Sequence, residues 1–227
     1  GVPQILSGTG ATGTFSGTYP KIIPNVTWTK RYIGRSGNGT GDGWYIGNID
    51  DFRIYNRVLN PYEVSILYLS GQNTIKLLEF GDTFYDDTTN LVAWYKFNGN
   101  GNEMLMDSSG NAYHLVNNGG SIFDNVNYRT GNGSVYLNGS SQYLDMPASI
   151  NPYTVWNNGN GMTFTCWFKM STSSGTWARF FDFSDGAINA VASNWIVFNK
   201  NNTGTTLFFE IYTNNGSKTN FVPTISY

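Results

Sequence analysis

The chain contains very little cysteine or histidine, and this scarcity excludes several kinds of site. Cys166 is the single cysteine and His114 the single histidine among 227 residues. One cysteine cannot form an intramolecular disulfide, nor supply a zinc site built from several cysteines. Because Cys166 alternates with Phe164 and Phe168 in an apolar run, we expect it to be a buried, unreactive thiol.

Charge is also scarce. Charged residues make up 12% of the chain and the formal net charge is −2. No basic run is present, which argues against a nucleic-acid partner, because such a partner needs a positive stripe facing its phosphates. No apolar window reaches the roughly 18 residues of a membrane span. The first residues also lack a charged and apolar leader, which predicts that the chain was cut from within a longer precursor.

Asparagine, glycine, serine and threonine take the place of the missing charge. These residues compete with the helical backbone and favour turns and short strands. The hydrophobic share of 40% and the aromatic share of 16% are sufficient for a packed core. N-x-S/T sequons favour an exposed, extracellular location; they occur at Asn25, Asn38, Asn132, Asn138, Asn201 and Asn215.

Alternating apolar and polar residues predict many short strands. In one such run Phe52 and Ile54 share one face, while Asp51, Arg53 and Tyr55 share the other. Asn-Gly and Asp-Gly turns separate the runs, as is typical of a sandwich or barrel. Further strands are predicted at Leu91–Phe97, Gly133–Leu137, Gln142–Met146, Met162–Met170, Ala178–Phe183, Trp195–Asn199 and Thr206–Thr213.

One segment has the signals of a helix. Asn60 suits the N-cap, Pro61 the first helical position, and Glu63 completes the spacing of a capping box. Gly71 is a plausible end. The apolar stripe of this helix is predicted to consist of Val64, Leu67 and Tyr68.

Two stretches resemble the concanavalin A-like, laminin-G-type jelly roll. LVAWYKFNGNG at Leu91–Gly101, DSSGN at Asp107–Asn111 and SVYLNGSSQYLDMP at Ser134–Pro147 are similar to the opening half of that design. Residues 32–69, which contain IDDFRIYNRVLNPYE, are similar to its closing half. The resemblance and the strand pattern together predict an all-β, jelly-roll β-sandwich of antiparallel sheets with one short helix.

The closing half precedes the opening half in this chain. We therefore divide it into residues 1–71, a linker at 72–90 in which Ile75–Phe80 could form a short strand, and residues 91–227. The chain is either a window from a tandem array or a permuted single sandwich. Either half alone would leave open sheet edges, so each needs a partner half, and 50–55 should pair with a strand like the one at 91–97.

The sequence does not have the features of an enzyme. Its fifteen acidic residues include no alternating E-x-D-x-E strand, the pattern by which glucanases of this fold place their acid and nucleophile on one face. No Ser-His-Asp arrangement is legible either. His114 is expected to have a structural role.

The resemblance implies a structural calcium site. Relatives hold Ca²⁺ near the D-x-S-G-N loop and the closing strand, which suggests Asp107, Asn111 and Asp51 as ligands here. Such oxygen-rich loops suit the six to eight ligands of the ion. The alternative is an Asx-turn at the loop, with an outward carboxylate at Asp51.

One aromatic and polar cluster is a candidate sugar site. Sugar sites combine flat aromatic faces with planar hydrogen-bonding groups. Strand alternation places Trp177, Arg179, Phe181 and Phe183 on one face of a strand and Phe180 and Asp182 on the other. The alternatives are core packing of the aromatic rings and an inter-strand pair between Arg179 and Asp182. The carbohydrate-binding candidates are Trp177, Arg179, Asp182, Asp185 and Trp195.

Three functions are consistent with these features. The first is a non-catalytic carbohydrate-binding module, with a glycan or cell-surface polysaccharide as partner. The second is a structural or attachment domain of a virion, phage or cell-surface fibre, with neighbouring copies as partners. The third is an accessory domain of a glycoside hydrolase. Each predicts an extracellular, cell-surface or virion-surface location, and one fold can host all three.

Overall fold

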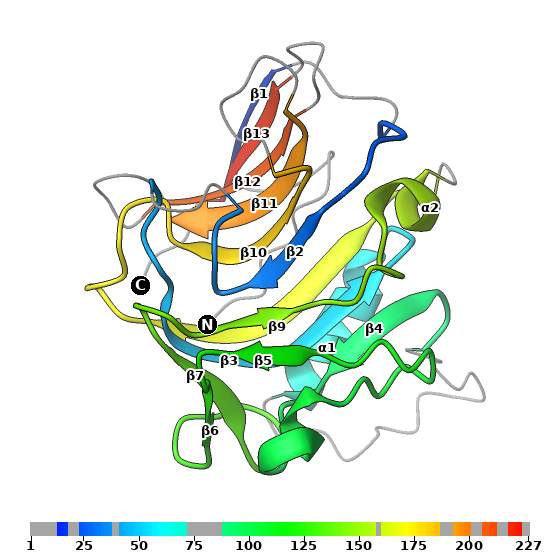
Figure 1. Cartoon of the computed structure of the whole chain (residues 1–227). Helices are drawn as coiled ribbons and strands as arrows, with labels where there is room; N and C mark the ends of the chain where they lie inside the picture. Colours follow the sequence, from blue (N-terminus) through cyan, green and yellow to red (C-terminus); the bar gives the residue numbers. More distant parts are fainter. Residues whose placement is uncertain are drawn as a thin grey trace, which may run out of the picture.

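The protein is a β-sandwich of two antiparallel sheets (Figure 1). The computed structural model describes residues 13–17, 23–37, 41–71, 88–157, 160–186, 193–200, 206–212 and 218–223. The strands are β1 (Gly13–Gly17), β2 (Lys30–Ile33), β3 (Ile46–Tyr55), β4 (Leu91–Tyr95), β5 (Val116–Asn118), β6 (Ile122–Asp124), β7 (Ser134–Asn138), β8 (Tyr143–Asp145), β9 (Thr163–Met170), β10 (Arg179–Ser184), β11 (Trp195–Lys200), β12 (Leu207–Tyr212) and β13 (Lys218–Pro223). The helical segments are α1 (Pro61–Ser70), the 3₁₀ turn η1 (Gly101–Leu105) and the short α2 (Pro152–Trp156).

Each sheet has a simple strand order. The larger sheet has eight strands in the order β1-β13-β12-β11-β10-β2-β8-β5. The smaller has five strands and is organised around β3, which pairs with β9 along one edge and with β4 and β7 along the other, β6 following β7. The predicted all-β sandwich of antiparallel sheets is therefore confirmed.

Strands from the early part of the chain complete both sheets. In the larger sheet β2 lies between β10 and β8. In the smaller sheet the register places Phe52 opposite Tyr95 and Ile54 opposite Ala93, which confirms the expected pairing of these two segments. Ile75–Phe80 and most of the linker lie outside the described residues. The assignment of the segments to two halves of one family design stays a prediction.

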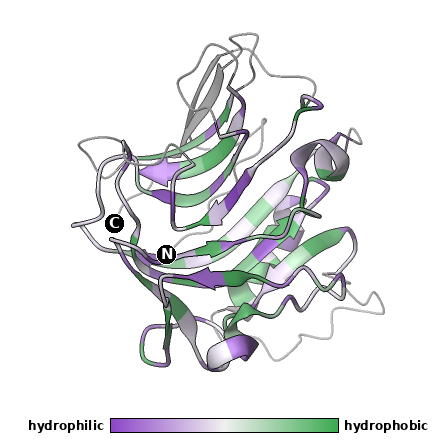
Figure 2. Ribbon diagram, in the orientation of Figure 1, coloured by the Kyte–Doolittle hydropathy of each residue, from purple (hydrophilic) through white to green (hydrophobic). Residues whose placement is uncertain are grey.

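The core lies between the two sheets and is rich in aromatic rings. Hydrophobic and hydrophilic residues alternate along many strands (Figure 2). Phe164 of β9 stacks on Phe181 of β10 with ring centroids 4.3 Å apart, and Phe168 meets Phe180 edge-on at 4.6 Å. Each such pair contributes about 0.5–1.5 kcal/mol beyond its buried area. The fully buried members of the core include Ile33, Tyr45, Ile54, Ala93, Tyr95, Val135, Leu137, Leu144, Phe180, Phe183 and Ile196.

Cys166 packs against this core from β9 and is partly buried. Burial, reinforced by the nearby carboxylates of Asp51 and Asp50, raises the pKa of its thiol to about 12. Since the thiolate is the reactive form, the expected unreactive thiol agrees with this environment.

Strand β10 departs from the predicted alternation. A β-bulge between Arg179 and Phe181 interrupts its pairing with β11. Phe180, Phe181 and Phe183 therefore all join the core, and Arg179 lies beside Asp182, with 3.6 Å between Nε and Oδ2. The prediction that Arg179 shares a face with Phe181 is wrong, because the extra residue of a bulge reverses the side-chain alternation. The Arg179–Asp182 pair lies within β10 rather than between strands.

Helix α1 covers the outer face of the smaller sheet. Its capping box is formed as predicted, with Asn60 accepting from the Glu63 backbone at 3.0 Å and Glu63 accepting from the Asn60 backbone at 2.7 Å. Leu67 is buried in a second small cluster with Tyr55, Leu59 and Leu91. No helix in the described part of the chain is long and apolar enough to cross a membrane.

Replacement of Asn60 by alanine tests this cap. We expect Asn60→Ala to lower the free energy of unfolding by about 1 kcal/mol, because the Glu63 N–H loses its acceptor. Urea unfolding followed by tryptophan fluorescence measures the change. Asn60→Asp, which keeps an acceptor oxygen, is the control and should stay close to the wild type; equal stability of the alanine variant would contradict the assignment.

Candidate functional site

Protein donors surround the carboxylate of Asp107, the first predicted calcium ligand. Its Oδ1 accepts from the backbone N–H groups of Trp94 and Ser109, both at 2.9 Å. Its Oδ2 accepts from the Ser109 hydroxyl at 2.8 Å and from Tyr113 N at 3.0 Å. Asn111 donates through Nδ2 to two carbonyl groups of β4, at 3.1 and 3.0 Å. The loop is therefore an Asx-type turn that is fastened to β4.

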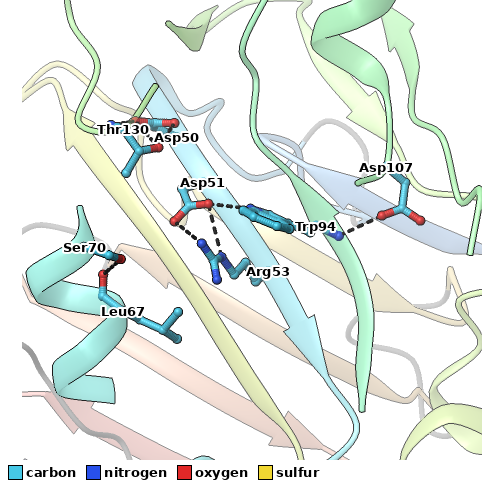
Figure 3. A network of polar contacts seen from close by, with 8 residues as sticks. All are labelled: Asp50, Asp51, Arg53, Leu67, Ser70, Trp94, Asp107 and Thr130. Carbon is cyan, nitrogen blue, oxygen red and sulfur yellow. Dashed lines mark hydrogen bonds and ion pairs between the residues drawn. The ribbon is translucent and has the colours of Figure 1, made fainter. Parts of the chain in front are cut away.

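Asp51, another predicted calcium ligand, forms a separate set of hydrogen bonds with Arg53 and Trp94 (Figure 3). It has a positive φ of 51° and a buried side chain. It accepts two bonds from Arg53, at 3.1 and 3.2 Å, and one from the indole N–H of Trp94 at 2.5 Å. Burial lowers the pKa of Arg53, but Asp51 and Tyr55 together more than reverse this, so the net direction is upward. Asp51 is therefore committed to an internal ion pair.

The structure does not bring the three predicted calcium ligands together into one group. Figure 3 shows Asp51 at the indole nitrogen of Trp94 and Asp107 at its backbone nitrogen, on opposite sides of that residue. Among the described residues, no three His, Cys, Asp or Glu side chains group as metal ligands would. Calcium needs six to eight free oxygen ligands, and these carboxylates already accept N–H and O–H donors.

Calcium should therefore leave the stability unchanged. We expect the melting temperature in 5 mM CaCl₂ and in 5 mM EDTA to agree within about 1 °C, because ligand-linked stabilisation requires a site that binds the folded state. Differential scanning calorimetry, with MgCl₂ as the ionic-strength control, measures it. A saturable rise of several degrees with calcium alone would show that these loops do take the ion.

Asp50 fastens a neighbouring loop. Its Oδ2 accepts from the backbone N–H groups of Arg129 and Thr130, both at 2.7 Å. Burial raises the pKa of Asp50 from 3.8 to about 6, against the lowering effect of these two bonds. The folded state therefore holds a proton on this group more tightly than the unfolded chain does.

This shift predicts that stability falls as the pH rises. Asp50 loses its contribution as it ionises, between the unfolded pKa near 4 and the folded pKa of about 6. Burial also raises the pKa of Asp145 and Asp182, which adds in the same direction. We expect the free energy of unfolding in urea to be roughly 1–2 kcal/mol lower at pH 7.5 than at pH 4.5.

Asp50→Asn should reduce this pH dependence, because the variant has no proton to release at that position. A wild-type protein that gains stability between pH 4.5 and 7.5, or a variant with an undiminished slope, would contradict the assignment.

Two of the predicted sugar contacts, Arg179 and Asp182, form a buried network with Asp42, Asn199 and Gly37. Arg179 and Asp182 are 5% and 0% exposed. Arg179 Nη2 pairs with Asp42 at 3.0 Å, and the amide of Asn199 is best oriented to accept from Arg179 Nη1 at 2.7 Å. Asp182 accepts from Gly37 N at 3.0 Å. Side chains so deeply enclosed are placed to support a surface rather than to touch a ligand.

The other three predicted contacts are dispersed along the same strands. Trp195 is 9% exposed and stacks on Tyr212 with ring centroids 4.1 Å apart. Asp185 follows β10 and accepts from Asn194 N at 3.0 Å and Asn194 Nδ2 at 2.7 Å. Trp177 precedes β10 and is partly buried, with a φ of 58°. The structure brings Arg179 and Asp182 together, but it does not gather the five residues into one exposed platform.

A partly exposed cluster that the sequence did not indicate lies beside this network. It comprises Tyr32 of β2, Tyr143 of β8, and Arg35 and Trp44 from the connection between β2 and β3; we call it the Arg35 cluster. The guanidinium carbon of Arg35 lies 5.2, 5.3 and 4.6 Å from the ring centroids of Tyr32, Trp44 and Tyr143. Tyr32 meets Tyr143 edge-on at 5.1 Å.

The Arg35 cluster lies on the outer face of the larger sheet. Ile33 and Leu144, the neighbours of Tyr32 and Tyr143 along their strands, join the core, so the two tyrosines face away from it. Arg35, Trp44 and Tyr143 are each partly exposed. The register places Tyr32 beside Asp182. The cluster and the buried network are therefore neighbours on one face.

The buried network holds the connection that carries Arg35 and Trp44. Gly37 donates to Asp182, and Asp42 binds both Arg179 and the Ser36 hydroxyl, the latter at 2.6 Å. A Cβ atom at Gly37 would collide with the Ser184 hydroxyl, so only glycine allows this close approach. The sequence pattern thus identified Arg179 and Asp182, which hold this connection in place, but not Arg35 and Trp44, which the connection presents at the surface.

Electrostatically, the cluster is dominated by cations. Lys30 Nζ lies 5.9 Å from the Tyr32 ring centroid, on the same face of β2. Burial raises the pKa of Asp145, and the charges of Arg31, Arg35 and Lys30 oppose this shift. Asp145 accepts from Asn118 Nδ2 at 3.3 Å. The positive charges of three side chains therefore act on this one carboxylate.

A depression of about 510 Å³ lies elsewhere, between η1 and the strands β5 and β6. Two of its amide side chains are already engaged: Asn100 accepts from Gly101 N at 3.0 Å, and Asn117 binds Ser121 through both its oxygen and its nitrogen. Its lining contains one aromatic ring, Phe123, and no charged side chain, so the Arg35 cluster is the better candidate for a sugar site.

Comparisons with known proteins do not identify a family. The chain matches no protein-family model, and neither the curated proteins nor the solved structures contain a significant match. The function must therefore be argued from the site itself.

Proposed function

We propose that this protein is a non-catalytic carbohydrate-binding module, and that the Arg35 cluster is its sugar site. The observation that carries the proposal is the meeting of three aromatic rings and a guanidinium on a rigid sheet, with Arg35, Trp44 and Tyr143 partly exposed. Aromatic faces pack against the C–H faces of sugar rings, and planar donors bind their hydroxyl groups. The cluster supplies both.

The hydrogen bonding of Arg35 supports this assignment. In the part of the chain that the structure describes, Arg35 Nε is buried without a hydrogen-bond partner. A buried polar atom without a partner costs about 1–3 kcal/mol, so a ligand that changes the solvation or position of Arg35 would recover part of that cost. The edge-on Tyr32–Tyr143 pair leaves the rings in fixed positions, which lowers the entropy lost on binding.

The carboxylates of this face support a non-catalytic role. Asp42 and Asp182 are held by Arg179, and Asp145 by Asn118. None of them stands as a free pair of the kind that glycosidases place about 5–9.5 Å apart across a bond to be cleaved.

His114 does not complete a catalytic triad in this arrangement. Its Nδ1 accepts from the Asp107 backbone at 3.0 Å, while the Ser109 hydroxyl donates to Asp107. In a working triad the serine would donate to the histidine. The wider proposal includes membership of the laminin-G-like family and an extracellular, cell-surface or virion-surface location; both rest on the sequence resemblance.

A glycan array followed by titration calorimetry tests the proposal. We expect saturable binding of a defined set of glycans, and at least a tenfold loss of affinity in Trp44→Ala and in Tyr143→Ala, since each removes a ring face worth about 1.4 kcal/mol or more. Tyr62→Ala, which removes an aromatic ring that is 56% exposed on α1, is the matched control and should bind as the wild type does.

Two results would contradict the proposal. A wild-type protein that binds no glycan on the array would exclude the function. Binding that survives in folded Trp44→Ala and Tyr143→Ala, as judged by unchanged circular dichroism, would exclude the site.

A further inference from the structure

Two cations of the outer face have no anionic partner in the described part of the chain. Arg35 lies over three aromatic rings and Lys30 over Tyr32; among the described residues neither forms an ion pair within 4 Å. Other arginines differ: Arg53 pairs with Asp51 at 3.1 Å, and Arg179 with Asp42 at 3.0 Å. The carboxylates near Arg35 do not replace the missing partner.

Each carboxylate near Arg35 either already binds another side chain or lies among a larger number of positive charges. Asp182 and Asp42 are held by Arg179. Asp145 accepts from Asn118 and is the single carboxylate among the charges of Lys30, Arg31 and Arg35. The region is therefore locally positive in a chain whose formal net charge is −2.

From this imbalance we infer that the Arg35 cluster selects an anionic saccharide, a sugar that carries a carboxylate or a sulfate group. The inference rests on the proposed function and deepens it. The anionic group binds the guanidinium of Arg35, Lys30 adds a second positive charge, and the sugar ring packs on the exposed parts of Trp44 and Tyr143.

The chemistry of arginine explains this preference. Its planar fork matches the oxygen atoms of a carboxylate or sulfate, and it can donate to them while it stacks on aromatic rings. Low-dielectric rings on three sides weaken the solvation of the cation and strengthen its attraction to an anion. A neutral sugar would gain the stacking but not the ion pair, which gives a charged sugar the higher affinity.

Titration calorimetry with matched saccharides tests the inference. One pair is tetragalacturonate and its full methyl ester, which differ in charge but share the ring skeleton. The second pair is a sulfated carrageenan tetrasaccharide and its desulfated form. We expect at least one anionic member to bind about tenfold or more tightly than its neutral counterpart, and a rise from 50 to 300 mM NaCl to reduce this difference.

Substitutions of Arg35 and Lys30 test which side chains cause the preference for anionic saccharides. Arg35→Gln should abolish the preference for the anionic member, leaving both members of the pair within about twofold, and Lys30→Gln should reduce it in part. Arg129→Gln is the matched control, because Arg129 is an exposed arginine over Trp167 of the smaller sheet, and it should keep the full preference. Melting curves confirm that each variant is folded; if Arg35→Gln is unfolded, the effect of Lys30→Gln decides.

The outcomes separate the two proposals. Equal affinity of the wild type for the charged and neutral members, or an equal loss of preference in Arg35→Gln and Arg129→Gln, overturns the anionic selectivity and leaves carbohydrate binding intact. The selectivity is also overturned if none of the four saccharides binds while a neutral glycan is found on the array. A flat array overturns the proposed function itself.

Discussion

The sandwich depends on the two-sided pairing of β3. This ten-residue strand pairs with β9 along one edge and with β4 and β7 along the other. Ile49, Phe52 and Ile54 enter the core from it, while on its opposite face the Asp51–Arg53 ion pair is buried. A buried ion pair is tolerated only when its remaining donors and acceptors are satisfied, and the Trp94 indole contributes to this from β4. The early and late parts of the chain therefore fold together through one strand.

On the larger sheet, too, a buried ion pair holds neighbouring segments together. The Arg179–Asp182 pair is too deeply buried to bind a ligand, but through Gly37 and Asp42 it fixes the connection that carries Arg35. A polar network beneath a surface costs desolvation energy, and its benefit is the exact placement of the groups above it. The candidate site is therefore a rigid support with a partly exposed aromatic and cationic surface, rather than a cavity.

Local signals in the sequence predicted the elements well. The Asn60 capping box is formed, and the strands that were predicted agree with the structure to within about two residues, because caps and side-chain periodicity depend on near neighbours. The strands β1, β2, β5, β6 and β13 and the short helix α2 were not predicted. The alternation along β10 was predicted incorrectly, since the bulge after Arg179 depends on pairing with β11. For the candidate site, Arg179 and Asp182 were predicted to contact the sugar, but the structure buries both side chains. Arg35 was not identified from the sequence.

The sequence by itself determined the fold class, the capped helix at Pro61–Ser70 and the polar, turn-rich character of the surface, because these follow from composition and local spacing. Only the tertiary structure decided which strands pair, that Asp51 contacts Arg53 and Trp94, and that Tyr143 meets Arg35 at 4.6 Å across more than a hundred residues of sequence. The physical reason is that side-chain environment is set by neighbours in space, and long-range pairing of strands brings those neighbours from distant parts of the chain.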